Sequence, residues 1–197
     1  AAKARTGLTL RMITPINIFT DLPALSALVA ELEPLFEPHG QISVTARPGA
    51  KDPIYDAIGW TPEGAKAADY SEITPPFRGT VVEELLNSLP CPFGRTRLML
   101  LRPKTCLSIH SDSGDRYHLA IKTNPGSYLI ELNDDGSGRF HHVPADGQVY
   151  RMDASRLHTA INAGRKPRIH LVACSALDHL TESHHTKGRL QTVLGQD

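Results

Sequence analysis

The chain has 197 residues, of which 40% are hydrophobic and 21% are charged, as is usual for a globular protein of one domain. Lys plus Arg and Asp plus Glu each number 21, so the net charge of zero provides no basic surface for nucleic acid or an anionic membrane. No apolar run reaches the roughly 18 residues that cross a bilayer, and Arg11 and Pro15 interrupt the only region where a signal peptide would need its apolar core. Three widely spaced cysteines form neither a disulfide framework nor a CxxC motif. We therefore expect a cytoplasmic protein with no nucleic-acid or membrane partner.

The first 90 residues carry signals for helices and loops. Asp21 followed by Pro23 is typical of a helix start, and the apolar residues that follow recur at helical spacing. Thr80 with Glu83 three residues later has the pattern of a capping box. In chain order the predicted elements are a helix over residues 22–36, a strand over 41–47, loops over 48–76 and a helix over 80–89.

After Pro90 the pattern changes to short strands separated by turn residues. Separators such as Asn124-Pro125-Gly126 and Ala145-Asp146-Gly147 have the chemistry of tight turns. Eight strands at close, regular spacing predict a jelly roll, a double-stranded β-helix of the cupin type. The expected strands cover residues 96–101, 105–110, 116–122, 127–132, 139–143, 148–152, 157–162 and 168–174.

The predicted fold class is therefore mainly β with N-terminal helices. We expect a single domain over residues 1–197, and we expect the chemistry to lie in its β half. Its parts are an N-terminal helical and loop lobe over 1–90, a jelly-roll catalytic core over 91–176 and a C-terminal extension over 177–197.

A histidine and an aspartate two residues apart are the first candidate for chemistry. His110 and Asp112 point to the same side of an extended chain, so both can reach one metal ion. His158 lies near the start of a later strand, and Arg168 opens the next strand ten residues on. We expect these two strands to be adjacent and antiparallel, which would bring the four residues together.

Two histidines and one carboxylate on one face are the ligands that bind Fe(II) for oxygen chemistry. An arginine beside such a site can hold a carboxylate through two parallel hydrogen bonds. A 2-oxo diacid could thus be held by iron at one end and by Arg168 at the other.

These residues resemble the aspartyl/asparaginyl β-hydroxylase family of Fe(II)- and 2-oxoglutarate-dependent oxygenases over about residues 95–175. The matching positions are His110-Ser111-Asp112, the segment Arg116-Tyr117-His118-Leu119, and His158 with Arg168 ten residues later. The resemblance implies iron bound by His110 and His158, the far carboxylate of 2-oxoglutarate bound by Arg168, and its other carboxylate supported by Arg116 and His118. Dioxygen and a small-molecule or peptide substrate would be the remaining reactants.

Asp112 departs from the best-known animal members of this family, which lack the carboxylate ligand, and agrees with the related bacterial free-proline hydroxylases. The substrate is therefore not fixed by the resemblance. Two alternatives stay open: a metal-dependent cupin-type enzyme that needs no 2-oxoglutarate, and a jelly-roll binding module without catalysis. The oligomeric state also stays open.

Several other residues have a structural interpretation beside a functional one. Arg116 and His118 could form a local pair with Asp115, and Arg97 could point into the barrel or form a cross-strand salt bridge. The remaining candidates are His141 and His142 on a strand, His179, His184 and His185 near the C-terminus, and Trp60 and Tyr70, which could form part of a substrate lid but are more typical of core anchors.

Overall fold

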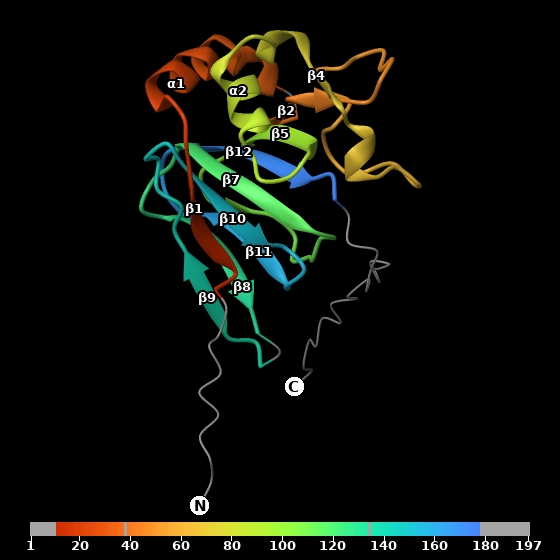
Figure 1. The fold of residues 1–197 in the computed structure, drawn as a ribbon. Coiled ribbons are helices and arrows are strands. Elements are labelled where there is room, and N and C mark those ends of the chain that lie inside the picture. The colour runs from red at the N-terminus through yellow and green to blue at the C-terminus, as the bar shows by residue number, and fades with distance from the viewer. Residues whose placement is uncertain (1–10, 38, 134, 178–197) are drawn as a thin grey trace, which may run out of the picture.

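Two antiparallel β-sheets face each other, and helices cover the outer face of the larger one (Figure 1). These features belong to a computed structural model that describes residues 11–37, 39–133 and 135–177. The predicted mainly-β jelly roll is confirmed. The C-terminal candidates His179, His184 and His185 lie outside the described residues.

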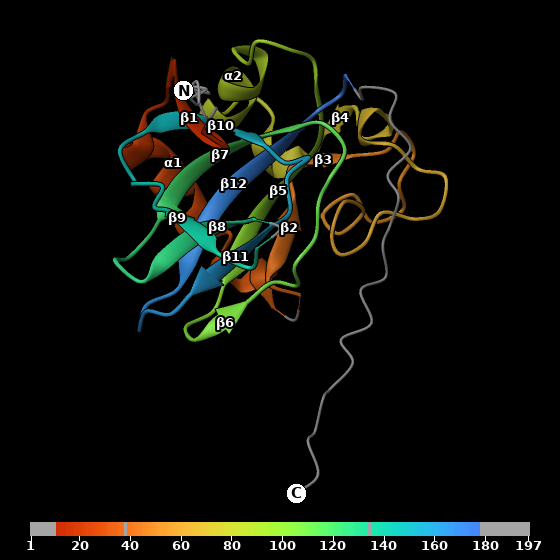
Figure 2. The same ribbon diagram turned by 90° about the horizontal axis from the view of Figure 1, so that it is seen from below.

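The larger sheet has six strands and the smaller sheet has four. In spatial order the larger sheet contains β1 (Ile13–Phe19), β10 (Gln148–Asp153), β7 (Asp115–Lys122), β12 (Arg168–Ser175), β5 (Phe93–Leu101) and β2 (Gln41–Ser43). The smaller sheet contains β6 (Thr105–Cys106), β11 (His158–Asn162), β8 (Ser127–Leu132) and β9 (Gly138–His141). Figure 2 shows the smaller sheet lying across the larger one. A separate two-stranded ribbon pairs β3 (Thr45–Ala46) with β4 (Glu72–Ile73).

The helices are shorter than the apolar spacing predicts. Helix α1 (Leu22–Glu31) is capped by Asp21, whose Oδ1 accepts a hydrogen bond from the Ala24 amide at 2.9 Å. It ends before Pro34, because a proline has no backbone N–H to continue the hydrogen bonds of an α-helix, and Glu33–Phe36 forms a separate 3-10 turn (η1). Helix α2 (Val81–Asn87) is capped by Thr80. Two further 3-10 turns, η2 (Ala67–Asp69) and η3 (Pro75–Phe77), lie in the region expected to be loops.

Alternation along β7 divides the protein into two cores. Tyr117 and Leu119 face the helices and belong to the larger hydrophobic cluster, while Ala120 belongs to the second cluster, between the sheets. Arg116 and His118 therefore share the inner face of the sheet with Ala120. The space between the sheets is thus polar at one end and apolar at the other, and the polar end contains the candidate site.

Strand β1 was not predicted from the sequence. It pairs with β10 at the edge of the larger sheet, and an edge is where a strand tolerates a proline such as Pro15. The expected strand over 105–110 is also shorter than predicted, because regular pairing ends at Cys106 and resumes only as an isolated bridge at His110.

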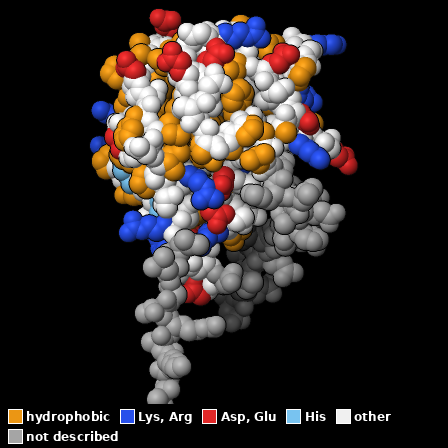
Figure 3. Space-filling model, in the orientation of Figure 1, with side chains coloured by type: hydrophobic (Ala, Val, Ile, Leu, Met, Phe, Trp, Pro, Cys, Tyr) orange, Lys and Arg blue, Asp and Glu red, His pale blue; other side chains and the backbone are white. Residues whose placement is uncertain are grey.

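Figure 3 shows acidic and basic side chains interspersed over the helical layer, in keeping with the balanced composition. Across the described segments, no helix combines the length and the apolar character needed to span a membrane.

Candidate metal centre and anion cradle

Backbone hydrogen bonds place His110 beside the start of strand β11 and Asp112 beside the turn that precedes this strand. The His110 amide donates to the His158 carbonyl at 3.0 Å, and the His158 amide donates back to the His110 carbonyl at 2.8 Å. Two residues later, the Asp112 amide donates to the Ala154 carbonyl at 2.8 Å. These hydrogen bonds hold the segment between β6 and β7 against β11, so residues 48 positions apart in the chain lie side by side.

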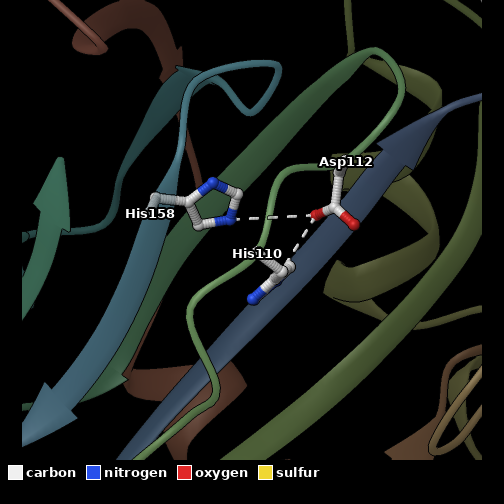
Figure 4. A group of neighbouring side chains, drawn as sticks. All are labelled: His110, Asp112 and His158. Atoms are coloured by element: carbon white, nitrogen blue, oxygen red, sulfur yellow. Dashed lines mark ion pairs between the residues drawn. The ribbon is translucent and has the colours of Figure 1, made fainter. Parts of the chain in front are cut away.

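The three side chains converge on one point (Figure 4). Oδ2 of Asp112 lies 3.9 Å from Nε2 of His110 and 3.9 Å from Nε2 of His158. One ligand atom from each residue lies within 4.8 Å of the other two. The predicted grouping of these three residues is therefore present, with two imidazole nitrogens and one carboxylate facing the same small volume.

Hydrogen bonds set the tautomers of both imidazoles. Nδ1 of His110 lies 2.7 Å from the Ser108 carbonyl, and Nδ1 of His158 lies 2.7 Å from the Arg156 carbonyl. A carbonyl only accepts, so each Nδ1 carries the hydrogen and each Nε2 presents a lone pair toward Asp112. This donor set of two imidazole nitrogens and one carboxylate oxygen fits a divalent iron ion.

The charges near Asp112 favour the ligating protonation states. Burial alone would raise the pKa of Asp112, but the positive charge of Arg116 and the neighbouring His110 and His158 lower the pKa below its usual value. Burial lowers the pKa of His158. At neutral pH the carboxylate is therefore ionised and the buried imidazole is neutral, as metal binding requires.

Arg116 and His118 lie on the inner face of β7, as their parity predicted. Arg116 Nε is 3.4 Å from Oδ2 of Asp112. Arg116 also contacts Asp115, since its Nη1 donates to the Asp115 backbone carbonyl at 3.3 Å. The Asp115 carboxylate accepts a hydrogen bond from Arg151 Nε at 2.7 Å. His118 is 6% exposed, and its Nδ1 has no hydrogen-bond partner among the described residues.

Arg168 is buried rather than solvated, and it is paired with a histidine that the sequence analysis missed. Arg168 Nη2 lies 2.7 Å from Nδ1 of His170, two residues along the same face of β12. A guanidinium only donates, so Nδ1 of His170 accepts and its Nε2 carries a hydrogen, yet that buried Nε2 has no partner among the described residues. Burial lowers the pKa of Arg168 to about 10, which leaves it charged at neutral pH. Buried donors with no acceptor are costly unless an anion satisfies them.

We call the side chains of Arg116, His118, Arg168 and His170 the cradle. The cradle and the candidate metal centre both face the space between the two sheets. The rings of His118 and His170 have centroids 5.9 Å apart, and after burial the charges of Arg168 and His158 are the next causes that lower the pKa of His118. The expectation that the strands carrying His158 and Arg168 are hydrogen-bonded neighbours is wrong, because β11 and β12 belong to opposite sheets. The two residues instead come from the two facing sheets, and the charges of both act on His118.

The other candidate residues from the sequence differ in burial and in their contacts. Tyr70 is fully buried and serves as a core anchor, whereas Trp60 is 79% exposed. Arg97 points inward from β5 without a cross-strand salt bridge in the described residues, and its Nη1 donates to Oε1 of Gln41 at 3.1 Å. His141 and His142 do not join the metal centre: His141 contacts Glu131, and His142 contacts a backbone carbonyl.

The buried histidines make stability depend on pH. Burial lowers the pKa of both His118 and His170 well below 6.5, so these rings stay neutral in the folded chain while the unfolded chain takes up protons. Stability is then complete above pH 6.5 and falls on acidification, by up to about 1.4 kcal/mol per pH unit for each histidine. We expect the melting temperature of the metal-free protein to change little between pH 7.5 and 6.5 and to drop as the pH falls from 6.5 to 5.5. In a His170→Asn variant the melting temperature should depend less steeply on pH. An equal pH dependence in the variant and the wild type would show that His170 does not contribute to it.

Comparison with known proteins places this chain in a family. The sequence profile of the aspartyl/asparaginyl beta-hydroxylase family matches residues 30–175. Among solved structures, a prolyl-4-hydroxylase from Pseudomonas putida has a TM-score of 0.50 at 15% identity, covering 85% of this chain and 94% of that chain, which establishes a shared fold. An oxidoreductase of the 2OG-Fe(II) oxygenase family from Burkholderia pseudomallei has a TM-score of 0.49 at 13% identity, covering 80% of this chain and 78% of that chain. No curated protein matches the chain. From the extent of the profile match, the chain belongs to the aspartyl/asparaginyl β-hydroxylase family.

Proposed function

We propose that the chain is an Fe(II)- and 2-oxoglutarate-dependent dioxygenase that hydroxylates a C–H bond of an amino acid, a peptide or protein side chain, or a small metabolite. The observation that carries the proposal is the presence of a His-Asp-His cluster and a buried cationic cradle in one interior. Family membership supports the same reaction class.

In this proposal His110, Asp112 and His158 hold the iron through the three atoms that already face one another. The bound metal and cosubstrate supply the oxidising chemistry: 2-oxoglutarate loses CO2 and becomes succinate, and the two atoms of O2 end in succinate and in the new hydroxyl group. Asp112 contributes a negative charge that offsets part of the metal's charge. Arg116, close to the same carboxylate oxygen, keeps that group ionised and oriented.

The cosubstrate is held, in this proposal, by the arginine and histidine side chains of the cradle. Arg168 and the Nε2 hydrogen of His170 bind the far carboxylate, and Arg116 and His118 support the carboxylate nearer the metal. A charged guanidinium in a buried site binds a carboxylate strongly because little water competes for it.

Anaerobic titration with Fe(II) and 2-oxoglutarate tests the proposal directly. We expect a weak visible charge-transfer band with one-to-one stoichiometry, and we expect it to vanish in a His110→Ala variant. Iron binding without the band would favour a cupin-type enzyme that needs no 2-oxoglutarate. A chain that binds no metal would instead be a jelly-roll binding module.

A further positive charge acts on the proposed metal ligand Asp112. Arg97 lies on the inner face of β5, and its Nε is buried without a hydrogen-bond partner among the described residues. Burial lowers its pKa to about 10, so it is charged at neutral pH, and Asp112 is the carboxylate whose charge acts on it. Because Asp112 is assigned to the metal, we propose that Arg97 receives an acidic group of the substrate. The exposed Trp60, next to the Gly59 carbonyl that Arg97 approaches at 3.5 Å, would flank the rest of the substrate.

Substitution of Arg97 with glutamine should therefore weaken substrate binding and leave the cosubstrate site intact. Once a substrate is found by succinate release, we expect its KM to rise about 10-fold to 100-fold, the range for losing one charge-assisted contact. The KM for 2-oxoglutarate should stay within about two-fold. A substrate whose acid group can be replaced by the amide without loss would contradict the role of Arg97.

A further inference from the structure

A buried carboxylate outside the metal centre is surrounded by three cationic or imidazole side chains. Glu131 on β8 is 4% exposed. Its carboxylate accepts hydrogen bonds from Arg156 Nη1 and, at 3.3 Å, from His141 Nε2, and Arg139 Nη1 lies 3.9 Å away. Burial would raise the pKa of Glu131, but its bonds to Arg156 and His141 outweigh burial and lower it. The proposed chemistry gives this cluster no role.

Arg156 connects that carboxylate to a proposed metal ligand. Its backbone carbonyl receives the hydrogen bond from Nδ1 of His158 at 2.7 Å. Its side chain is held at two points, by Glu131 and by Asp153, whose Oδ2 lies 3.5 Å from Arg156 Nε. The turn between β10 and β11 is thus fixed by a side chain whose own main chain orients the imidazole.

The register of the smaller sheet also places Glu131 beside His158. Glu131 lies directly opposite His158 in the β8–β11 pair, so both side chains stand on the same face, a few ångströms apart. Glu131, Arg156 and His158 are therefore connected to one another: Arg156 bonds to Glu131 through its side chain and to His158 through its carbonyl, and Glu131 pairs with His158 across the two strands. His110, by comparison, is oriented by the backbone carbonyl of Ser108, a residue with an uncharged side chain.

We propose that Glu131 and Arg156 are positioning residues that hold the imidazole of His158 in the orientation needed for metal binding. The inference rests on the proposed function. Without the ion pair the turn gains freedom, the Arg156 carbonyl moves relative to Nδ1, and Nε2 of His158 no longer points steadily at Asp112. Loss of a group that orients a metal ligand typically costs about 10-fold to 100-fold in metal affinity.

The test compares two arginines that contact the same carboxylate. Arg156→Gln removes the link to His158, whereas the matched control Arg139→Gln removes a cation from Glu131 without touching the turn. We expect Arg156→Gln to bind Fe(II) and Co(II) about 10-fold to 100-fold more weakly under anaerobic titration, with altered visible absorption of bound Co(II). Arg139→Gln should match the wild type, and Arg156→Lys should recover part of the affinity.

Each outcome decides the inference. Both arginines are partly exposed, so both variants are expected to fold, and thermal unfolding of the metal-free proteins checks this. Equal affinity and an equal Co(II) spectrum for Arg156→Gln and Arg139→Gln would overturn the positioning role while leaving the proposed function intact. A wild-type chain that binds neither ion would overturn the proposed function and the inference together.

Discussion

Replacement of His158 with alanine is expected to abolish tight iron binding and, with it, substrate hydroxylation. Only His110 and Asp112 would remain at the centre, and two ligands hold a divalent metal far more weakly than three. We expect metal affinity to fall by at least about 100-fold, more than the loss of an orienting group costs. Equilibrium dialysis of Fe(II) under anaerobic conditions measures the affinity, and succinate release measures the turnover.

The control must separate ligand loss from unfolding, because His158 is 5% exposed and packs in the barrel. His158→Gln preserves more of the volume and should lose the metal equally. The exposed His39, whose ring contacts Tyr55, supplies a matched histidine substitution that should leave the affinity unchanged. Iron bound by His158→Gln as tightly as by the wild type would remove this residue from the ligand set.

Replacement of Arg168 with glutamine is expected to raise the KM for 2-oxoglutarate by a large factor without loss of iron. Removing one partner of a buried charge pair costs about 2–5 kcal/mol, which corresponds to a factor of about 30 to several thousand. Steady-state succinate formation at varied 2-oxoglutarate gives the KM, and Fe(II) titration without cosubstrate gives the metal affinity.

Arg165, an exposed residue in the turn that precedes β12, is the matched control. Arg165→Gln removes a nearby positive charge without changing the interior and should leave the KM unchanged. If Arg168→Gln and Arg165→Gln behaved alike, the carboxylate would have to bind elsewhere.

Most of the β half could be predicted because its strands are short and its turns carry distinct residues. The expected strand over 127–132 matches β8, and the expected strands over 148–152 and 168–174 each differ from the structure by one residue. Turn chemistry such as Asn124-Pro125-Gly126 fixes where a strand stops. It carries no information about which strands pair, which is why β11 and β12 were expected to be neighbours and instead lie in opposite sheets.

Periodicity alone could group the residues of the candidate site only where they share a strand or a short spacing, whereas His158 and Arg168 were included through the family resemblance. His110 and Asp112, two positions apart, could be grouped from periodicity alone. His170 shares the face of β12 with Arg168 by the same rule, so its role in the cradle was open to prediction. Glu131 was not, since its partners Arg156 and His141 come from other strands and turns and meet it only through tertiary packing.

The main-chain bridge between His110 and His158 has a thermodynamic consequence for how a metal ion would bind at the proposed centre. Because two backbone hydrogen bonds already join the ligand-bearing residues, loading needs almost no ordering of the chain. Nearly all of the metal's binding free energy should then appear as added resistance to unfolding, growing with the logarithm of free ion concentration. The denaturant m-value, which reports the surface exposed on unfolding, should stay the same with and without the ion.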